Sequence, residues 1–173
     1  VVVIGAPGSG KTVYVNSVIE YLEQQYALLQ EADFRVAEGE HEDTSREKLT
    51  GINKMLSQGQ LPGSTPQDHA NGALTYKYTF RSASPVQIRN ITITDTPGED
   101  FLSPEGVRKH IETFKKADLI VFVFDPFQNA ALFEPMKGIL NVVDRVDELV
   151  DPFDVLDNVT QVLAEPGVRK PNS

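Results

Sequence analysis

The sequence predicts a three-layer α/β/α fold, in which helices cover both faces of a mostly parallel sheet with one antiparallel edge strand. Apolar runs at residues 1–4 and 119–124 are typical of buried parallel strands, and helical patterns separate them in the 173-residue chain. Two alternating runs, 74–80 and 91–94, lie so close together that only a hairpin can join them. We expect one domain over residues 1–173, because a chain of this length buries roughly 70% of its unfolded surface.

The first strand runs directly into a phosphate-binding loop. Residues 5–12 read Gly-Ala-Pro-Gly-Ser-Gly-Lys-Thr and match the pattern Gly-x-x-x-x-Gly-Lys-Ser/Thr. The glycines let the backbone bend so that successive N–H groups converge on a phosphate. A plain glycine turn is the alternative, but the strand before the loop and the helix after it are the context that the motif requires.

The chemistry of this loop assigns a role to each of its last two residues. Lys11 brings a cation to the β- and γ-phosphates and is a catalytic candidate. The Thr12 hydroxyl is a Mg²⁺ ligand at the start of a helix whose dipole favours anions. We expect the nucleotide to be held by Pro7, Gly8, Ser9, Gly10, Lys11, Thr12 and Val13.

The region between this loop and the hairpin reads as a helix followed by an insert over about residues 31–72. Apolar residues recur at helical spacing from Lys11 to about Leu29. Within the insert, Thr44 and Glu47 form a capping-box pattern before a second helical pattern. The insert is therefore expected to contain, in order, an acidic irregular segment at 31–43, a helix at 45–57 and a glycine-rich loop at 58–72.

After the hairpin, the pattern returns to helices around one apolar strand. Ser103 and Pro104 are typical of a helix start, with serine as the N-cap and proline at the first helical position. The expected elements are a helix at 104–116, the strand at 119–124 and helices at about 135–150 and 154–163.

A second motif ends the second strand of the hairpin. Asp95-Thr96-Pro97-Gly98 stands at the carboxyl end of that strand, where ligands bind in open α/β sheets. Asp95 is expected to hold Mg²⁺ through a water molecule, and Gly98 to place a bare backbone N–H against the γ-phosphate. On its own the pattern Asp-x-x-Gly usually marks a turn, but behind a complete phosphate loop it favours a nucleotide site.

Together, residues 5–12 and 95–98, joined by a β-hairpin, resemble the P-loop GTPases of the translation-factor and Ras-like class, the TRAFAC class. The resemblance implies a P-loop NTPase fold and a Mg²⁺-dependent switch that binds GTP and GDP and hydrolyses GTP slowly. Three features are similar to the double-GTPase type domains of bacteria and archaea. They are the long insert, Asp-Thr-Pro-Gly-Glu-Asp at 95–100 and Ala-Asp-Leu-Ile-Val-Phe-Val-Phe-Asp-Pro at 117–126.

The resemblance also implies further site residues. A threonine from the first switch loop completes the metal shell in this class; Thr65 is our candidate, with Ser64, Thr50 and Thr44 as alternatives. Glu99 stands where Ras-like members have a glutamine that orients the attacking water. Its carboxylate either holds that water or points to solvent, because its charge is unfavourable beside the γ-phosphate. Intrinsic hydrolysis is therefore expected to be slow unless a partner supplies an arginine.

Guanine recognition is implied by the resemblance and has no motif of its own in this chain. The class reads guanine with Asn/Thr-Lys-x-Asp, placed after the strand that follows residues 119–124. Lys116-Ala117-Asp118 precedes strand 119–124 and so lies at the sheet edge opposite the phosphates. The strand at 119–124 would also be left as an exposed edge, which native proteins avoid. We therefore expect a fragment that lacks the base-reading strand, with a fold incomplete at its C-terminal side.

Composition excludes several classes of function. The net charge of −9 argues against general affinity for nucleic acid or anionic lipid, both of which need basic patches. The chain has no cysteine, which excludes disulfides and thiolate metal sites and suits a reducing cytoplasm. No apolar run reaches the roughly 18 residues of a transmembrane span. His41, His69 and His110 have no metal-ligand spacing and are expected to be solvated.

The expected function is a cytoplasmic GTP-binding switch whose protein partners bind the switch loops and the insert. Two alternatives use the same phosphate chemistry. One is a P-loop ATPase or kinase-like enzyme, which differs in how it reads the base. The other is a scaffold that binds nucleotide without significant turnover and holds a partner through the insert.

Overall fold

The computed structural model describes residues 1–28, 32–36, 42–60, 74–83, 86–129, 131 and 150–168. In chain order, the elements are β1 (Val2–Ile4), α1 (Lys11–Leu28), β2 (Ala32–Val36), α2 (Glu42–Ser57), β3 (Leu74–Ala83), β4 (Val86–Asp95), η1 (Gly98–Phe101), α3 (Pro104–Arg108), α4 (Ile111–Lys115), β5 (Ile120–Phe122), η2 (Pro126–Gln128) and α6 (Pro152–Leu163). The elements labelled η are short 3₁₀ helices.

The described strands form one mixed sheet in the order β2-β3-β4-β1-β5. β1 pairs in parallel with β4 and β5, whereas β3 is antiparallel to both of its neighbours, β4 and β2. A single antiparallel strand in an otherwise parallel sheet confirms the predicted fold class. The β3–β4 register runs from Leu74 opposite Asp95 to Ala83 opposite Val86, which confirms the hairpin. Because β2 lies outside β3, the antiparallel strand is one place in from the edge.

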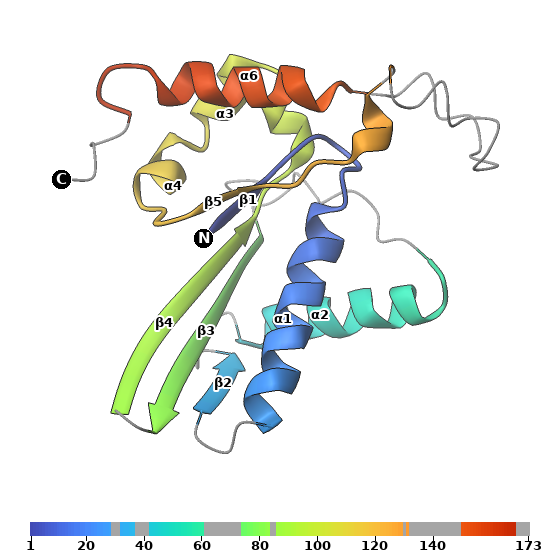
Figure 1. The fold of residues 1–173 in the computed structure, drawn as a ribbon, viewed down its shortest axis with the longest axis vertical. Coiled ribbons are helices and arrows are strands. Elements are labelled where there is room, and N and C mark those ends of the chain that lie inside the picture. The colour runs from blue at the N-terminus through green and yellow to red at the C-terminus, as the bar shows by residue number, and fades with distance from the viewer. Residues whose placement is uncertain are drawn as a thin grey trace.

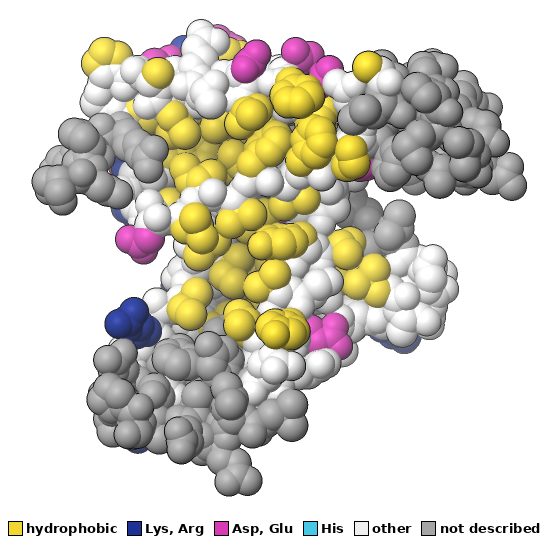
Figure 2. All heavy atoms as spheres, in the orientation of Figure 1, with side chains coloured by type: hydrophobic (Ala, Val, Ile, Leu, Met, Phe, Trp, Pro, Cys, Tyr) yellow, Lys and Arg dark blue, Asp and Glu magenta, His cyan; other side chains and the backbone are white. Residues whose placement is uncertain are grey.

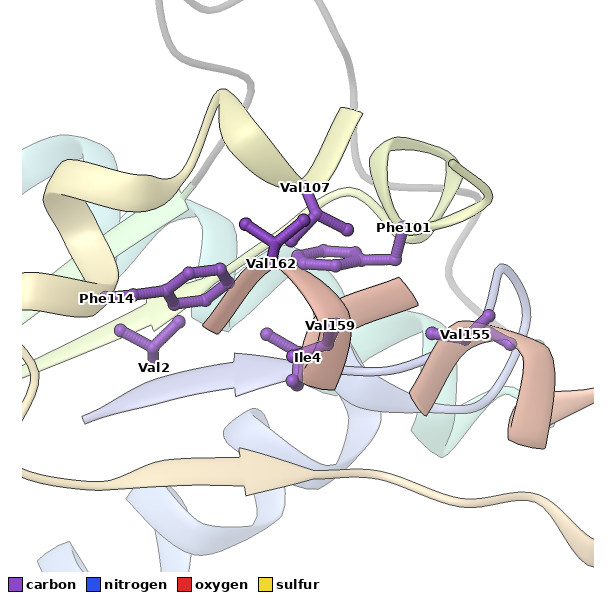
Figure 3. Packing of buried hydrophobic residues seen from close by; sticks show 9 residues of the cluster. Val2, Ile4, Phe101, Val107, Phe114, Val155, Val159 and Val162 are labelled. Atoms are coloured by element: carbon purple, nitrogen blue, oxygen red, sulfur yellow. The ribbon is translucent and has the colours of Figure 1, made fainter. Parts of the chain in front are cut away.

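Helices cover both faces of the sheet, with α1 and α2 on one face and α3, α4 and α6 on the other (Figure 1). Successive β1 side chains alternate between the faces, so Val3 packs toward Val15 and Ile19 of α1 while Val2 and Ile4 face the other layer. On that second face, the core residues are Phe101, Val107, Phe114, Val155, Val159 and Val162 (Figure 3). β1 therefore lies between two cores, and Ala6 of the loop that follows it belongs to the second of them.

The prediction of an irregular segment over 31–43 is wrong for Ala32–Val36, which form β2. Phe34 lies opposite Phe80, and Val36 lies opposite Tyr78 of β3. A five-residue alternation between acidic flanks is a weak signal by itself, and the pairing with β3 stabilises the strand.

Two helix predictions also need correction. α2 begins at Glu42, so Thr44 lies inside the helix and not at its N-cap. The helix expected over 104–116 is divided into α3 and α4 by a turn at Lys109 and His110. Ser103 nevertheless caps α3 as expected, because its Oγ accepts a hydrogen bond from the Gly106 N–H at 3.2 Å.

The C-terminal helical patterns have different outcomes. The helix expected over 154–163 is confirmed as α6, whose N-cap Asp151 accepts a hydrogen bond from the Phe153 N–H at 2.9 Å. The helix expected over 135–150 lies outside the described residues. Within the described part of the chain, we find no helix with the length and apolar character needed to cross a membrane.

The expectation of a solvated His110 is wrong. Its side chain is 2% exposed, and its Nε2 lies 2.8 Å from Asp100 Oδ2. His41 and His69 lie outside the described residues.

β5 forms the sheet edge next to β1, and in the described part of the chain it pairs with a strand on one side only. Its three residues are half-buried, while Leu119 and Phe124, just outside its ends, are exposed. On the face of the molecule seen in Figure 2, hydrophobic side chains gather in the region between α6 and α1.

Candidate functional site

The loop at residues 5–10 follows β1 and turns sharply into α1. Gly5, Gly8 and Gly10 have φ values of 153°, 71° and 86°, in a region that residues with a side chain rarely adopt. Gly5 also has no room for a Cβ, which would lie 2.4 Å from the Val123 carbonyl oxygen of the segment after β5. The loop therefore needs glycine both for its backbone path and for its close approach to the segment that follows β5.

Lys11 is the first residue of α1, and its ammonium group is buried within the loop. Nζ donates hydrogen bonds to the carbonyl oxygens of Gly5 at 3.1 Å and Ala6 at 2.8 Å. Burial lowers the pKa of Lys11, while the negative charges of Asp95 and Glu99 act in the opposite direction. The loop cation thus lies within the field of two negative charges, one from Asp95 of the second motif and one from Glu99 directly after it.

The two motifs meet through a hydrogen bond. Thr12 Oγ1 donates to Asp95 Oδ2 at 2.7 Å, across 83 positions of sequence. The contact follows from the parallel pairing of β1 with β4, in which Val3 lies opposite Asp95. Asp95 is fully buried, and Thr12 is half-buried. A hydroxyl and a carboxylate oxygen in this position are the ligand types that Mg²⁺ prefers.

The oxygens of Thr12 and Asp95 fit Mg²⁺ better than a metal whose ligands all come from protein side chains. No group of three or more His, Cys, Asp or Glu side chains that could hold a metal occurs among the described residues. Mg²⁺ is usually held by one or two carboxylates together with substrate phosphates and water. Thr12 and Asp95 are the described residues that would hold it. Thr65 and Ser64 lie outside the described residues, and Thr50 is exposed on α2.

Thr96 and Gly98 fasten the Asp-x-x-Gly segment to β1 and to the phosphate loop. The buried Thr96 Oγ1 donates to the Val3 carbonyl oxygen at 2.7 Å. A Cβ on Gly98 would lie 2.5 Å from the Pro7 backbone nitrogen, so only glycine allows this approach. The Gly98 backbone therefore packs directly against the loop. Its predicted contact with the γ-phosphate stays a prediction, and the sequence offers no signal for the anchoring role of Thr96.

Gln128 is a site residue that the sequence does not reveal. It ends η2, after β5, and is 8% exposed. Its Nε2 donates to the Pro7 carbonyl oxygen at 2.6 Å and lies 3.6 Å from where a Cβ on Gly8 would be. The next residue, Asn129, donates to Asp151 Oδ2 at the N-cap of α6 at 3.1 Å. Gln128 therefore supports the phosphate loop from the β5 side.

Replacing Gln128 by methionine keeps the length of the side chain and removes the donor to Pro7. We expect the free energy of unfolding to fall by about 1–2 kcal/mol, because the loop carbonyl loses its partner. Urea denaturation checks this, with Gln24→Met as the matched control. The Gln24 amide bonds Glu20 on the exposed side of α1, so that variant should change little. An unfolding free energy equal to that of the wild type for the Gln128 variant would contradict the supporting role.

The site has two parts: a glycine-rich loop with a buried lysine after β1, and an Asp-x-x-Gly segment at the end of the parallel neighbour strand, β4. These two parts define a P-loop nucleotide-binding protein. The family follows from comparison with protein-family models. The Double-GTPase 2 model matches residues 1–163, and the chain belongs to this family. Membership identifies the chain as a GTP-binding protein of the GTPase class. No curated protein and no solved structure matches the chain.

Proposed function

We propose that the protein is a Mg²⁺-dependent GTP-binding switch that hydrolyses GTP slowly. The observation that supports this most directly is the 2.7 Å hydrogen bond between Thr12 and Asp95. It joins the hydroxyl that ends the phosphate loop to the carboxylate that ends β4, and both oxygens are of the kind that would hold the metal. The family supports guanine over adenine as the base.

The residues of the phosphate loop have separate tasks in this proposal. The backbone of residues 7–13 holds the phosphates, and Lys11 exchanges its carbonyl partners, Gly5 and Ala6, for phosphate oxygens. Mg²⁺ held by Thr12 and Asp95 would neutralise negative charge on the β- and γ-phosphates. Gly98 packs against Pro7 of the loop, and in this proposal its backbone N–H contacts the γ-phosphate, which distinguishes GTP from GDP.

Glu99 is the reason to expect slow turnover. It is half-buried, and its negative charge acts to raise the pKa of Lys11. A carboxylate beside the γ-phosphate adds a like charge and supplies no cation to the transition state. A protein partner that provides an arginine would therefore accelerate hydrolysis. We propose the switch segments and the insert at 31–72 as the surfaces that such partners bind.

Isothermal titration with GTP, GDP, ATP and ADP tests the proposal, in Mg²⁺ and in EDTA. We expect guanine nucleotides to bind at least about tenfold more tightly than adenine nucleotides, a difference of about 1.4 kcal/mol. EDTA should weaken GTP binding. Phosphate release should be on the order of 10⁻⁴ to 10⁻² s⁻¹, the range of GTPases without an activating partner.

The alternative functions give different results in the same measurements. A preference for ATP would favour an ATPase or kinase-like enzyme. Tight GTP binding with no phosphate release over hours would favour a scaffold. Nucleotide binding that does not depend on Mg²⁺, or no binding at all, would refute the proposal.

A further inference from the structure

A buried polar cluster lies directly behind the Asp-x-x-Gly segment. His110, in the turn between α3 and α4, places Nε2 2.8 Å from Asp100 Oδ2. A carboxylate can only accept, so Nε2 carries the proton. On the exposed side, Asp100 Oδ1 accepts a hydrogen bond from Lys109 Nζ at 2.9 Å. The Phe101 ring stacks on the imidazole, with centroids 5.4 Å apart and planes at 20°.

Asp100 accepts these bonds as a carboxylate. Burial acts to raise its pKa, but the hydrogen bonds and charges of Lys109 and His110 outweigh burial, so the pKa lies below its ordinary value. Hydrogen bonds to an ionised acceptor are roughly twice as strong as neutral ones. The apolar rings of Phe101 and Phe114 surround the imidazole and keep water from competing for it.

Asp100, whose carboxylate is bonded to His110, lies two residues after Gly98, which packs against the phosphate loop. Gly98 packs against Pro7, Asp100 is held by His110, and only Glu99 lies between them. Consecutive Cα atoms are about 3.8 Å apart, so the fixed positions of Gly98 and Asp100 restrain the backbone of Glu99 between them. The residue bonded to His110 and the residue that packs against the loop therefore belong to the same short turn, η1.

η1 is also held on its other sides. Asn158 of α6 donates to the Phe101 carbonyl oxygen at 3.1 Å. A Cβ on Gly106 would lie 2.1 Å from the Asp100 carbonyl oxygen, so α3 meets the turn backbone to backbone. These contacts fix the outer side of the turn. Asp100 is the neighbour of Glu99 in η1, and the contact described for its carboxylate that lies away from solvent is the bond to the buried His110.

We propose that Asp100 and His110 form a positioning pair that orients the Gly98 backbone toward the γ-phosphate. The inference rests on the proposed GTPase function. His110 contacts neither nucleotide nor metal and acts through Asp100. Displacement of a reacting group by about 1 Å costs up to roughly 100-fold in rate, so loss of the pair should slow hydrolysis more than it weakens nucleotide binding.

Two substitutions at His110 separate positioning from packing. His110→Phe keeps an aromatic ring for the stack on Phe101 and removes the donor, while His110→Gln keeps an amide donor at nearly the reach of Nε2. We expect His110→Phe to lower single-turnover GTP hydrolysis by about 10- to 100-fold and to leave GDP affinity within about twofold. His110→Gln should restore hydrolysis to within about threefold of the wild type, because it restores the bond to Asp100.

Asp100→Ala removes the same bond from the other side and serves if the His110 variants fail to fold. It should match His110→Phe, and the double variant should be no slower than either single variant, as expected for groups that act as a unit. Lys109→Ala is the matched control. It removes the other partner of Asp100, but that lysine is exposed, so hydrolysis should be unchanged.

The outcomes separate this inference from the proposed function. A wild-type protein that binds GTP without hydrolysing it defeats the proposed GTPase activity. A wild-type protein that turns over, with His110→Phe and Asp100→Ala equally active, defeats the positioning pair alone. Parallel losses of hydrolysis and GDP affinity, or an inactive His110→Gln that folds normally, would show a general structural role and would also overturn the pair.

Discussion

Lys11→Ala is expected to weaken GTP binding by about 10- to 100-fold, since a hydrogen bond to a charged group contributes about 1.5–3 kcal/mol. Lys11 is the cation closest to the loop backbone, where its Nζ already bridges two carbonyl oxygens. Without the charge of Lys11, only the loop amides and Mg²⁺ would be left to balance the negative charge of the phosphates. Titration of the variant with GTP, GDP and a non-hydrolysable GTP analogue measures the loss.

Two comparisons make the Lys11 result specific. Lys11→Met retains most of the buried stem, so an equal loss in both variants assigns the effect to the charge and not to packing. Glu99→Ala removes the neighbouring carboxylate and should change triphosphate affinity by less than about threefold, because Glu99 is not expected to contact the ground-state phosphates. Similar losses for Lys11→Ala and Glu99→Ala would contradict the assignment of the phosphate contact to Lys11.

The residues that the sequence predicts for the site are those that belong to short local patterns. The glycines and Lys11 fall within eight consecutive residues, and Asp95 marks the end of an alternating strand. The hydrophobic pattern places both strands in the sheet, and parallel strands end at the same edge, so the meeting of Thr12 with Asp95 follows from topology. A pattern of this kind can be read before any fold is known.

The residues that the sequence does not predict act through long-range contacts. Gln128 meets Pro7 across 121 positions, and its identity becomes meaningful only when β5 is placed beside β1. His110 stands within a helical pattern and reads as a surface residue. Its burial arises because the chain turns there, between α3 and α4, and brings the ring under Asp100. Side-chain pairing across a turn leaves no period in the sequence.

The errors in the predicted elements have related physical causes. β2 is too short and too charged at its flanks to show a clear alternation, and it depends on β3 for its hydrogen bonds. Thr44 and Glu47 match a capping pattern, but α2 begins at Glu42, so the match lies inside the helix. Local patterns compete with tertiary contacts, and here the contacts prevailed in a whole strand, β2, at the start of α2 and in the middle of the helix expected over 104–116.

Asp95→Asn is expected to remove most of the Mg²⁺ dependence of GTP binding. The amide keeps the size of the side chain and can still accept the hydrogen bond from Thr12, but it no longer carries the charge that attracts the cation. In Mg²⁺, affinity should fall by about tenfold or more. In EDTA, affinity should stay equal or rise, because a negative charge near the phosphates is gone. The ratio of the two affinities, measured by titration, is the diagnostic quantity.

Asp118→Asn is the matched control for this substitution. Asp118 is exposed and precedes β5, which runs parallel to β1, so its carboxylate lies at the end of the sheet away from the phosphate loop. Its variant should retain the full Mg²⁺ dependence. It should also retain the preference for GTP over ATP, since Lys116-Ala117-Asp118 is at the wrong end of the sheet to read the base. A Mg²⁺ dependence that survives in Asp95→Asn would place the metal away from Asp95, and the joint site of the two motifs would then have to be abandoned.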